Sequence, residues 1–363
     1  MAKRRKRIHP GGPDEPISRE ARSDPVRPRL AAEPADLDRD EDAGIVAAES
    51  RPAGPIAASH PSPIESDVSP ETTPTGPIHR PVLLDEVLQW LRPREGAVLV
   101  DGTVGAGGHA AALARHVGTS GRVIGLDRDP AMLALAKQAT RGLPVTLVHA
   151  PYSQTGEVLD DLGIDRIDGL LLDLGLSSDQ LAWAHRGFSF AQEGPLDMRF
   201  DPEGDLTAAE IVNTWPADDL ADLFFKYGEE RFSRRIARRI VEARRERPIQ
   251  TTSQLAELVR RSLPGPRGKI DPATRVFQAL RIGVNRELDH LDAALAHLAD
   301  WLRPGGRAAI ISFHSLEDRR VKQAFRDNPR LIVLTKKPLT ASDEEIQRNP
   351  RARSAKLRVA ERC

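Results

Sequence analysis

The chain has 363 residues, of which 39% are hydrophobic, and its 53 Lys and Arg residues balance 53 Asp and Glu residues, so net charge favours no partner. The one cysteine, Cys363, excludes a disulfide framework and a cysteine-based metal site. No apolar run approaches the roughly 18 residues of a membrane span. The basic start is followed by Pro and Asp instead of an apolar core, which argues against a secretory signal. A soluble, cytoplasmic protein of two or three domains, with no membrane partner, is therefore predicted.

The first 75 residues differ in composition from the rest of the chain. They hold 12 of its 29 prolines and no Phe, Trp or Tyr. Such a segment buries too little apolar surface to offset the entropy lost on ordering. We therefore predict a disordered N-terminal extension over residues 1–75. Its basic cluster Lys3–Arg7 is interpreted as a solvated tail, with nucleic-acid contact as the alternative.

Ordered structure is predicted from about residue 79, where leucines and a valine recur at helical spacing as far as Leu91. Strand-like and helix-like patterns then alternate. The expected strands are Val98–Val100, Val123–Leu126, Val145–His149 and Gly169–Asp173, and the expected helices are Ala110–Val117, Ala131–Ala139 and Thr155–Leu162. Strands separated by helices of this length predict right-handed crossovers and a parallel sheet.

The alternation stops after residue 183 and resumes near residue 290. Residues 184–289 contain helix-like stretches and no convincing buried strand. The later pattern predicts a helix over Asp289–Leu302, a strand over Ala308–Ser312, a helix over Glu317–Asp327 and strands over Leu331–Thr335 and Ala355–Ala360. We predict an α/β core of residues 76–183 and 290–363, with a helical domain inserted over 184–289.

A glycine-rich loop follows the first expected strand. The apolar run ends in Asp101, and four glycines follow it before the first helix of the alternating region, at 102, 105, 107 and 108. Glycines let the backbone turn tightly and come close to a ligand. The second apolar run ends in Asp127, where nucleotide-binding folds place the acid that binds a ribose. The pattern predicts a site for an adenosine-containing cofactor.

Two such cofactors compete for this loop. A dinucleotide needs G-x-G-x-x-G with its pyrophosphate at a helix N-terminus, whereas the loop has Asp101-x-x-x-Gly105-x-Gly107-Gly108. S-adenosylmethionine has no phosphate, and an acid at the end of the first strand suits its cationic methionine amine. The Arg-Pro-Gly-Gly block before the fifth strand also resembles class I methyltransferases. The pattern favours S-adenosylmethionine, with a Rossmann dehydrogenase as the alternative.

Longer strings extend this likeness through the predicted core and insertion. Together they resemble the bacterial small-subunit (16S) ribosomal RNA cytosine-N4 methyltransferase family, over about residues 78–362. The strings are HRPVLLDEV from His79, DGTVGAGGH from Asp101, LLLDLGLSSDQL from Leu170, RGFSF from Arg186, GPLDMRFD from Gly194, YGEERFSRRIARRI from Tyr227, TRVFQALRIGVNREL from Thr274, ISFHSLEDR from Ile311 and NPRARSAKLRVAER from Asn349.

The resemblance implies a class I AdoMet-dependent methyltransferase: a Rossmann-like α/β fold with a seven-stranded, mostly parallel sheet and an inserted helical domain. The implied reaction methylates the exocyclic N4 of one cytidine in the decoding region of small-subunit ribosomal RNA. The partner would be that RNA, within the assembled small subunit, and a homodimer is compatible with the sequence. The implied cofactor contacts are Gly107, Gly108, His109, Asp127, Tyr152, Asp173 and Gln180.

Three of these positions have a direct physical reading. Asp127 can accept hydrogen bonds from both ribose hydroxyls, or be a solvated acid at a strand end. Tyr152, where many family members have Phe, offers an aromatic face for adenine at the carboxyl edge of the sheet. His109 can meet the methionine carboxylate with its ring or its backbone N–H, or can simply begin a helix.

The chemistry of the target directs attention to Asp173 and His314 as catalytic candidates. Cytosine N4 is a poor nucleophile, because its lone pair is delocalised into the ring. Enzymes acting on such amines often carry Asp/Asn-Pro-Pro-aromatic, whereas this chain has Asp173-Leu-Gly-Leu. Asp173 can contact the cofactor, the amine or both, and we favour the cofactor. His314 can accept a proton or orient the base, or be structural.

Two further features of the sequence bear on the site. Phe313 can stack on an extruded cytosine, although core packing is favoured. The loop Gly194–Arg199 has a composition compatible with a lid over the cofactor cleft. No His, Asp and Glu cluster has metal-ligand spacing, so no catalytic metal is predicted.

The predicted insertion carries an arginine-rich helix. Arg231, Arg235, Arg238 and Arg239 lie broadly opposite an apolar face of Phe232, Ile236 and Ile240. An exposed arginine row can follow a phosphate backbone. The alternative pairs these arginines with the nine acidic residues of 201–230.

A second helix of the insertion is predicted to open at Asp271-Pro272. Its polar residues Gln278, Arg281 and Asn285 fall near one face. They either meet RNA or seat the insertion on the core.

Two other functions compete with the favoured one. The chain could methylate DNA or a small metabolite, although the long insertion disfavours a metabolite. It could also be a non-catalytic RNA-binding factor that keeps the fold. The favoured reaction is direct in-line displacement from sulfur, without a covalent enzyme intermediate.

Overall fold

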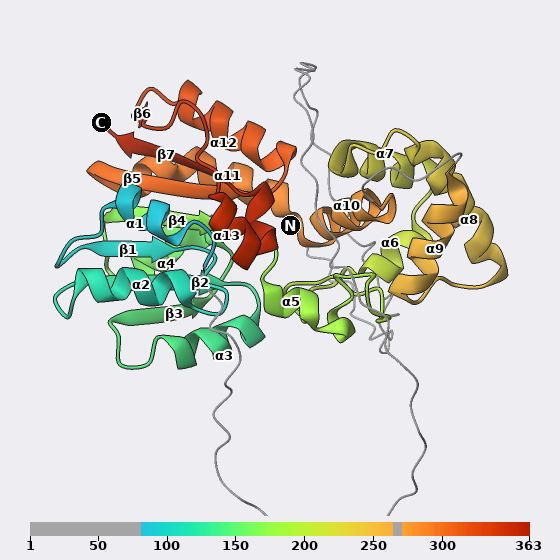
Figure 1. The fold of residues 1–363 in the computed structure, drawn as a ribbon, viewed down its shortest axis with the longest axis horizontal. Helices are drawn as coiled ribbons and strands as arrows, with labels where there is room; N and C mark the ends of the chain where they lie inside the picture. The colour runs from blue at the N-terminus through green and yellow to red at the C-terminus, as the bar shows by residue number, and fades with distance from the viewer. Residues whose placement is uncertain (1–80, 264–270) are drawn as a thin grey trace, which may run out of the picture. The chain divides into compact units, whose positions relative to one another are not determined.

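A seven-stranded sheet forms the centre of the computed structural model, which describes residues 81–263 and 271–363. Its strand order is β3-β2-β1-β4-β5-β7-β6 (Figure 1). All neighbouring pairs are parallel, except that β7 runs antiparallel to β5 and β6. The strands are β1 Val98–Asp101, β2 Arg122–Asp127, β3 Val145–His149, β4 Ile167–Asp173, β5 Leu302–Ser312, β6 Leu331–Val333 and β7 Lys356–Arg362.

Helices cover both faces of this sheet because successive strand residues point to opposite faces. Leu99 of β1 and Leu171 of β4 pack in one buried cluster, and their neighbours Val100 and Leu170 pack in the other. The first cluster is completed by α1 Leu84–Leu91, α2 Gly108–Val117 and α3 Pro130–Ala139, and the second by α4 Thr155–Asp161, α11 Glu287–Trp301 and α12 Ser315–Asp327. This confirms the seven-stranded, mostly parallel α/β architecture.

The fifth strand begins six residues earlier than the sequence pattern predicts. Its first pair joins Leu302 to Ile167, and the next joins Arg307 to Gly169. The intervening Arg-Pro-Gly-Gly residues form an irregularity in which Gly305 has a φ of 78°. The predicted turn is therefore a bulge inside β5, since pairing with β4 begins before the turn residues.

Residues 184–289 fold mainly as helices (Figure 1). Their described parts, 184–263 and 271–289, contain no strand, only an isolated bridge between Pro195 and Thr251. The α-helices are α6 Ala208–Thr214, α7 Ala217–Gly228, α8 Ser233–Glu246, α9 Thr252–Ser262 and α10 Ala273–Asn285, before α11 starts at Glu287. That this segment is a separate domain with the boundaries 184 and 289 stays a prediction.

Two short helices absent from the predicted elements are α5 Ser178–Ala182 and α13 Asp343–Arg348, and 3-10 turns occur at Tyr152–Gln154, Ala184–Arg186 and Pro350–Ser354. The predicted disorder of residues 1–75, with its basic cluster, lies outside the described residues. None of the described helices combines the length and the apolar character needed to cross a bilayer.

The polar face of α10 holds the helical segment together and ties it to the core. Gln278 donates to the carbonyl oxygen of Tyr227 at 3.0 Å, and Arg281 forms a two-bond ion pair with Glu287. The buried Asn285 accepts from Phe200 N–H at 2.7 Å and donates to Met198 O at 2.7 Å. Of the two predicted uses of these residues, the contacts favour seating.

Candidate active site

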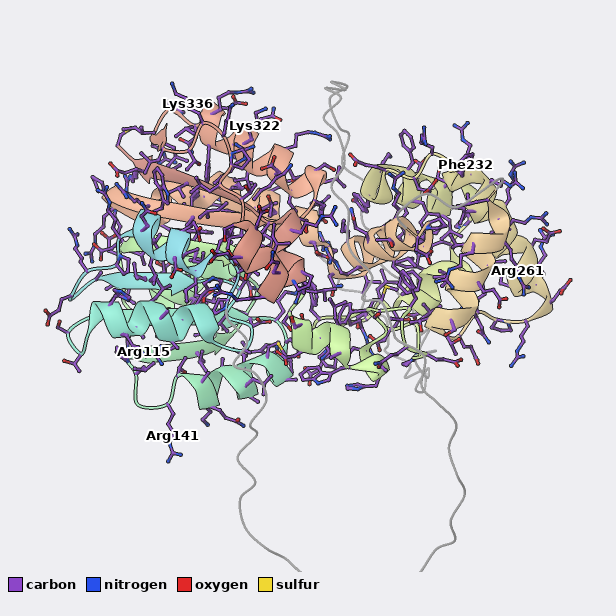
Figure 2. The ribbon with its side chains drawn as sticks, viewed as in Figure 1. Arg115, Arg141, Phe232, Arg261, Lys322 and Lys336 are labelled. Atoms are coloured by element: carbon purple, nitrogen blue, oxygen red, sulfur yellow. The ribbon has the colours of Figure 1, made fainter. Side chains whose placement is uncertain are left out.

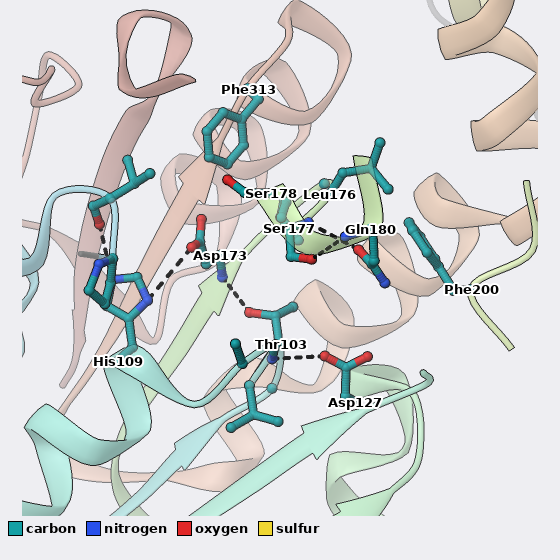
Figure 3. A pocket seen from close by; sticks show the side chains of 18 of the residues that line it. Thr103, His109, Asp127, Asp173, Leu176, Ser177, Ser178, Gln180, Phe200 and Phe313 are labelled. Carbon is teal, nitrogen blue, oxygen red and sulfur yellow. Dashed lines mark hydrogen bonds and ion pairs between the residues drawn. The ribbon is translucent and has the colours of Figure 1, made fainter. Parts of the chain in front are cut away.

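A cavity opens at the carboxyl ends of β1, β2, β4 and β5, where parallel strands deliver their following loops to one edge of the sheet. Figure 3 shows its centre, with Asp173 between His109 and the α5 segment. Among its lining residues are Pro81, Gly102, Thr103, Gly105, Gly108, His109, Asp127, Arg128, Tyr152, Asp173, Gly175, Ser178, Gln180, Phe200, Glu287, Phe313, Glu317 and Arg351.

The predicted glycines of the loop face different surroundings. Gly108 lines the cavity, and a Cβ there would lie 2.5 Å from Cγ of Pro81. Gly107 is not a lining residue: with a φ of 88°, it packs against α3, where a Cβ would lie 2.9 Å from Cα of Ala136. Gly107 therefore supports the loop from behind, whereas Thr103 and Gly105, which the predicted set omits, face the cavity.

Asp127 ends β2 with both carboxylate oxygens near backbone amides. Oδ2 accepts the N–H of Gly105 at 2.9 Å, and Oδ1 accepts the N–H of Asp129 at 2.9 Å. Burial nevertheless raises the pKa of Asp127 to about 6. Because a carboxylate offers about four lone-pair sites, two acceptor positions remain for a ligand in the cavity.

Aromatic side chains lie at this part of the cavity. The hydroxyl of Tyr152 donates to the carbonyl oxygen of Glu287 at 3.2 Å, and its half-buried ring lines the cavity. Phe200 comes from the helical segment, and the guanidinium of Arg128 lies 5.9 Å from its ring centroid. Phe200 is absent from the predicted set because no local pattern relates it to Tyr152, 48 positions earlier.

His109 is buried at the start of α2 and has a fixed ring orientation. Its Nε2 lies 3.0 Å from the carbonyl oxygen of Val82. Because a carbonyl only accepts, Nε2 carries the proton. Burial lowers the pKa of His109 to about 4, so the ring is neutral near pH 7 and Nδ1 is unprotonated. That Nδ1 lies 3.6 Å from Oδ2 of Asp173 and cannot donate to it.

Asp173, at the end of β4, has a carboxylate with unmet hydrogen-bonding capacity. Its Oδ1 is buried and has no hydrogen-bond partner among the described residues. Burial raises the pKa of Asp173 to about 7, although the charge of Arg351 opposes that rise. A buried acceptor without a donor is costly, so a donor or a cation entering the cavity would be stabilised there.

Gln180 lines the cavity but has its side-chain amide engaged with protein groups. Its Oε1 accepts the N–H of Ser177 at 3.0 Å, which closes a capping box at α5. Its Nε2 donates to Oδ2 of the buried Asp129 at 2.9 Å. Gln180 therefore fixes the position of α5, and any cofactor contact by it stays a prediction.

His314 does not line the cavity, although it was predicted as catalytic. Its buried Nε2 lies 3.2 Å from Oε1 of Glu317, which does line it. Oε2 of Glu317 accepts the N–H of Phe313 at 2.8 Å. Burial raises the pKa of Glu317, but His314 and Arg281 outweigh this effect and lower it below the usual value. The group that faces the cavity is thus a carboxylate, and His314 lies behind it.

The four arginines predicted to contact RNA all lie exposed around the start of α8. Ile236 and Ile240 are buried opposite them, but Phe232 is 41% exposed, which corrects its place on the apolar face (Figure 2). Arg239 pairs with Glu242 on the same helix, at 2.8 Å, whereas Asp222 and Glu229 of the preceding acidic segment pair with Lys226 and Arg319. Both predicted uses of the arginine row, RNA contact and pairing with the acidic segment, stay predictions.

Among the described residues, no group of three or more His, Cys, Asp or Glu could hold a metal ion. The strand order, the glycine-rich loop after β1 and the acid after β2 define a class I AdoMet-dependent methyltransferase. Residues 77–363 match the model of the MraW methylase family. The chain belongs to this family.

Two relatives share about half of their residues with this chain. The chain is 51% identical over 314 residues to "Ribosomal RNA small subunit methyltransferase H" of Synechococcus sp. (strain JA-2-3B'a(2-13)), covering 82% of this chain and 97% of that one. It is 49% identical over 309 residues to the protein of the same name from Thermomicrobium roseum, covering 80% and 95%.

Solved structures give a weaker likeness. An rRNA methylase from Streptococcus thermophilus is 13% identical with a TM-score of 0.36, covering 79% of this chain and 99% of that chain. TrmN from Thermus thermophilus is 15% identical, also with a TM-score of 0.36, covering 77% and 48%. At these TM-scores the likeness carries no argument about function.

The residues present fit S-adenosylmethionine. Asp127 keeps acceptor positions suited to two ribose hydroxyls, and Tyr152 offers an aromatic wall. The unpartnered Oδ1 of Asp173 lies in the same cavity, where positive charge is favoured. The tight packing of Gly108 on Pro81 lets the loop backbone border the cavity without a side chain.

Proposed function

We propose that this chain is an AdoMet-dependent methyltransferase that methylates the exocyclic N4 of a specific cytidine in the decoding region of small-subunit ribosomal RNA. The observation that carries the proposal is the cavity that holds Asp127 and the unpartnered Oδ1 of Asp173, in a chain whose residues 77–363 match the MraW methylase family. The names of the 49–51% identical relatives support small-subunit ribosomal RNA as the substrate class.

Asp127 and Asp173 have different roles in this reaction. Bound S-adenosylmethionine supplies a methyl group on a positively charged sulfur, which a nitrogen nucleophile takes by direct displacement. Asp127 holds the ribose end, and Asp173 accepts a hydrogen bond from the target amine, which orients the nitrogen lone pair. Most of the rate is expected to come from positioning of the amine against the methyl group.

For His314 we propose a positioning role in place of the predicted catalytic one. Because it lies behind Glu317 and not in the cavity, it would act by positioning the Glu317 carboxylate. The Asp173 carboxylate is the better candidate for the group that faces the amine, since its Oδ1 has a free acceptor position. Loss of the amine proton to water remains sufficient after methylation.

The exposed arginine row at α8 supports RNA as the macromolecular partner. Guanidinium groups match phosphate oxygens, and a row along one helix face can follow a backbone. We propose the assembled small subunit, in the cytoplasm, as the site of action. The homodimer stays a prediction, which sedimentation of the purified protein at several concentrations would test.

The test is mass mapping of ribosomal RNA from a deletion strain. We expect loss of one N4-methyl mark in the small-subunit RNA, rescue by the wild-type chain and no rescue by Asp173→Ala. A methylation assay on assembled small subunits, naked RNA and DNA separates the substrates. An unchanged methylation map, or preferred methylation of DNA, would exclude the proposed function.

A further inference from the structure

The cavity continues past Asp173, on the side away from the predicted ribose acceptor. Figure 3 shows Phe313 and Ser178 on one side of Asp173, and Thr103 and Asp127 on the other. Since Asp127 is the acid suited to a ribose, the cofactor belongs to the second side. The first side is left for the group that receives the methyl.

Arg351 supplies a positive charge on the side of the cavity that holds Phe313 and Ser178. It comes from the 3-10 turn Pro350–Ser354, and it is half-buried and lines the cavity. Its Nη1 donates to Oγ of Ser178 at 2.8 Å, so the turn is tied to the start of α5 across 173 positions of sequence. A guanidinium carries five N–H donors, so this bond leaves others available.

Asp173 and Arg351 remain separately available to a ligand. Both line the cavity, and no ion pair or hydrogen bond joins them among the described residues. The buried Oδ1 of Asp173 is an acceptor without a donor. The cavity therefore offers an unused acceptor and unused donors within one compartment.

An aromatic ring borders the same compartment. Phe313 is half-buried and lines the cavity, and its Cδ2 would lie 3.6 Å from a Cβ placed on Gly175. The absence of a side chain at Gly175 thus leaves the ring accessible from that side. Bases taken out of a nucleic-acid stack are held by stacking on such rings and by hydrogen bonds to their Watson–Crick edge.

The edge of cytosine presents the complementary groups. Its N4 amine donates, and its N3 and O2 accept, so a cytosine reader needs one acceptor beside two donors. Uracil places an acceptor, O4, where cytosine has its donor, and a donor, N3–H, where cytosine has an acceptor, so a guanidinium facing N3 would meet a second donor. A carboxylate facing O4 would meet a second acceptor, and a buried polar group would remain unpaired.

We propose that Asp173, Arg351 and Phe313 form a cytosine-reading pocket, in which Asp173 accepts from N4, Arg351 donates to N3 and O2, and the Phe313 ring stacks on the base. Ser178 positions the guanidinium. The proposal rests on the proposed function for the identity of the substrate, and it adds Arg351 as a residue that, together with Asp173, distinguishes cytosine from uracil.

The test compares Arg351→Met with Arg353→Met, an exposed arginine two positions along the same 3-10 turn. The probes are two short RNAs, each with a single C or U in an adenine background, bound in the presence of S-adenosylhomocysteine. We expect the wild-type chain to prefer the C-containing RNA by about tenfold or more, and Arg351→Met to lose that preference. Arg353→Met keeps it.

Two further measurements separate a base contact from the other roles that Arg351 could have. Calorimetry with S-adenosylhomocysteine should give a Kd for Arg351→Met within about threefold of wild type, which also shows that the variant folds. Arg351→Lys should keep RNA affinity but lose most of the C-over-U preference, because an ammonium lacks the planar fork.

Three results would overturn the proposal. A wild-type chain that binds both RNAs equally has no such pocket. If Arg351→Met lost affinity for S-adenosylhomocysteine as strongly as for RNA, the guanidinium would contact the cofactor. If the variant lost affinity equally for the C-containing and the U-containing RNA, the guanidinium would contact phosphate. A wild-type chain that prefers C but leaves ribosomal RNA unmethylated would disprove the proposed function alone.

Discussion

At the scale of single residues, the site depends on half-buried carboxylates at the ends of the two strands that flank β1. Asp127 and Asp173 end β2 and β4, and burial raises the pKa of each, to about 6 and about 7. A buried acid with a raised pKa favours its neutral form until a donor or a cation arrives. The two residues therefore respond differently to mutation and to pH.

Asp127→Ala should weaken S-adenosylhomocysteine binding by about 100-fold or more, because two hydrogen bonds to a charged acceptor are lost at about 1.5–3 kcal/mol each. Asp127→Asn retains one acceptor oxygen, so its affinity for S-adenosylhomocysteine should lie between those of the wild type and Asp127→Ala. Calorimetry measures the affinities, with the exposed Asp161→Ala on α4 as the control. Wild-type affinity in Asp127→Ala would contradict the assigned ribose contact.

The pKa of Asp173 predicts how cofactor affinity varies with pH. A cation selects the ionised carboxylate, so the Kd for S-adenosylmethionine should be about twentyfold smaller at pH 8 than at pH 6, about tenfold from Asp173 and about twofold from Asp127. Asp173→Asn should leave only about the twofold change expected from Asp127. Calorimetry at both pH values tests this, and an equal dependence in Asp173→Asn would contradict it.

The same raised pKa has the opposite effect on the cofactor-free fold. The folded chain holds the Asp173 proton up to about pH 7, whereas the unfolded chain releases it near the ordinary pKa of 3.8 for an aspartic acid. Since the folded state then binds more protons, the free energy of unfolding falls as pH rises through this window. Cofactor binding offsets this loss at the upper end.

At the scale of elements, α10 decides where the helical segment meets the cavity. Its last residue, Asn285, is buried and holds the backbone on both sides of Arg199, next to the cavity-lining Phe200. Arg128, another lining residue, donates to the carbonyl oxygen of Asn285 at 2.6 Å. The end of one helix thus fixes two walls of the site.

Asn285→Ala should therefore affect stability and cofactor affinity together. Unpaired backbone groups should cost about 1–3 kcal/mol of unfolding free energy, and displacement of Phe200 should weaken S-adenosylhomocysteine binding about fivefold. Asn213→Ala is the matched control, because Asn213 similarly bonds to Ala209 and Ile249 away from the cavity. Urea unfolding measures the stabilities, and calorimetry measures the affinities for S-adenosylhomocysteine. Equal affinities of the two variants would contradict the link between Asn285 and the cavity wall at Phe200.

At the scale of the whole molecule, charge is balanced overall and uneven locally. Lys and Arg equal Asp and Glu in number, so no net field steers the chain to RNA. The arginines around the start of α8 form a local positive surface, and Phe232, labelled in Figure 2, follows Arg231 in sequence and is 41% exposed. RNA affinity should then depend on a few positions only.

Arg235→Ala with Arg238→Ala should lower the slope of log affinity against log salt by about 1.4–1.8 and weaken RNA binding about tenfold at physiological salt. The control is Arg115→Ala with Arg141→Ala, two exposed arginines of the α/β core (Figure 2). Filter binding across a salt series measures both. If the control pair lowered the salt slope and the RNA affinity by the same amounts, the arginines of α8 would have no specific role in RNA binding.

The sequence by itself determined the alternation of strands and helices, the glycine-rich loop and the acids at the strand ends. These features are local, because burial periodicity and glycine conformations act over a few residues. The predicted strand β3 matches its observed bounds, and β5 departs from them only where pairing with β4 extends past a turn.

Only the tertiary structure decided which residues share the cavity. It brings Phe200, Glu317 and Arg351 to the edge of the sheet, turns Gly107 toward α3 and places His314 behind Glu317. Arg351, for example, bonds to Ser178 across 173 positions of sequence, and no local pattern encodes such a contact. Contacts of this kind depend on how the helical segment and the strand-end loops pack, and that packing is a property of the whole chain.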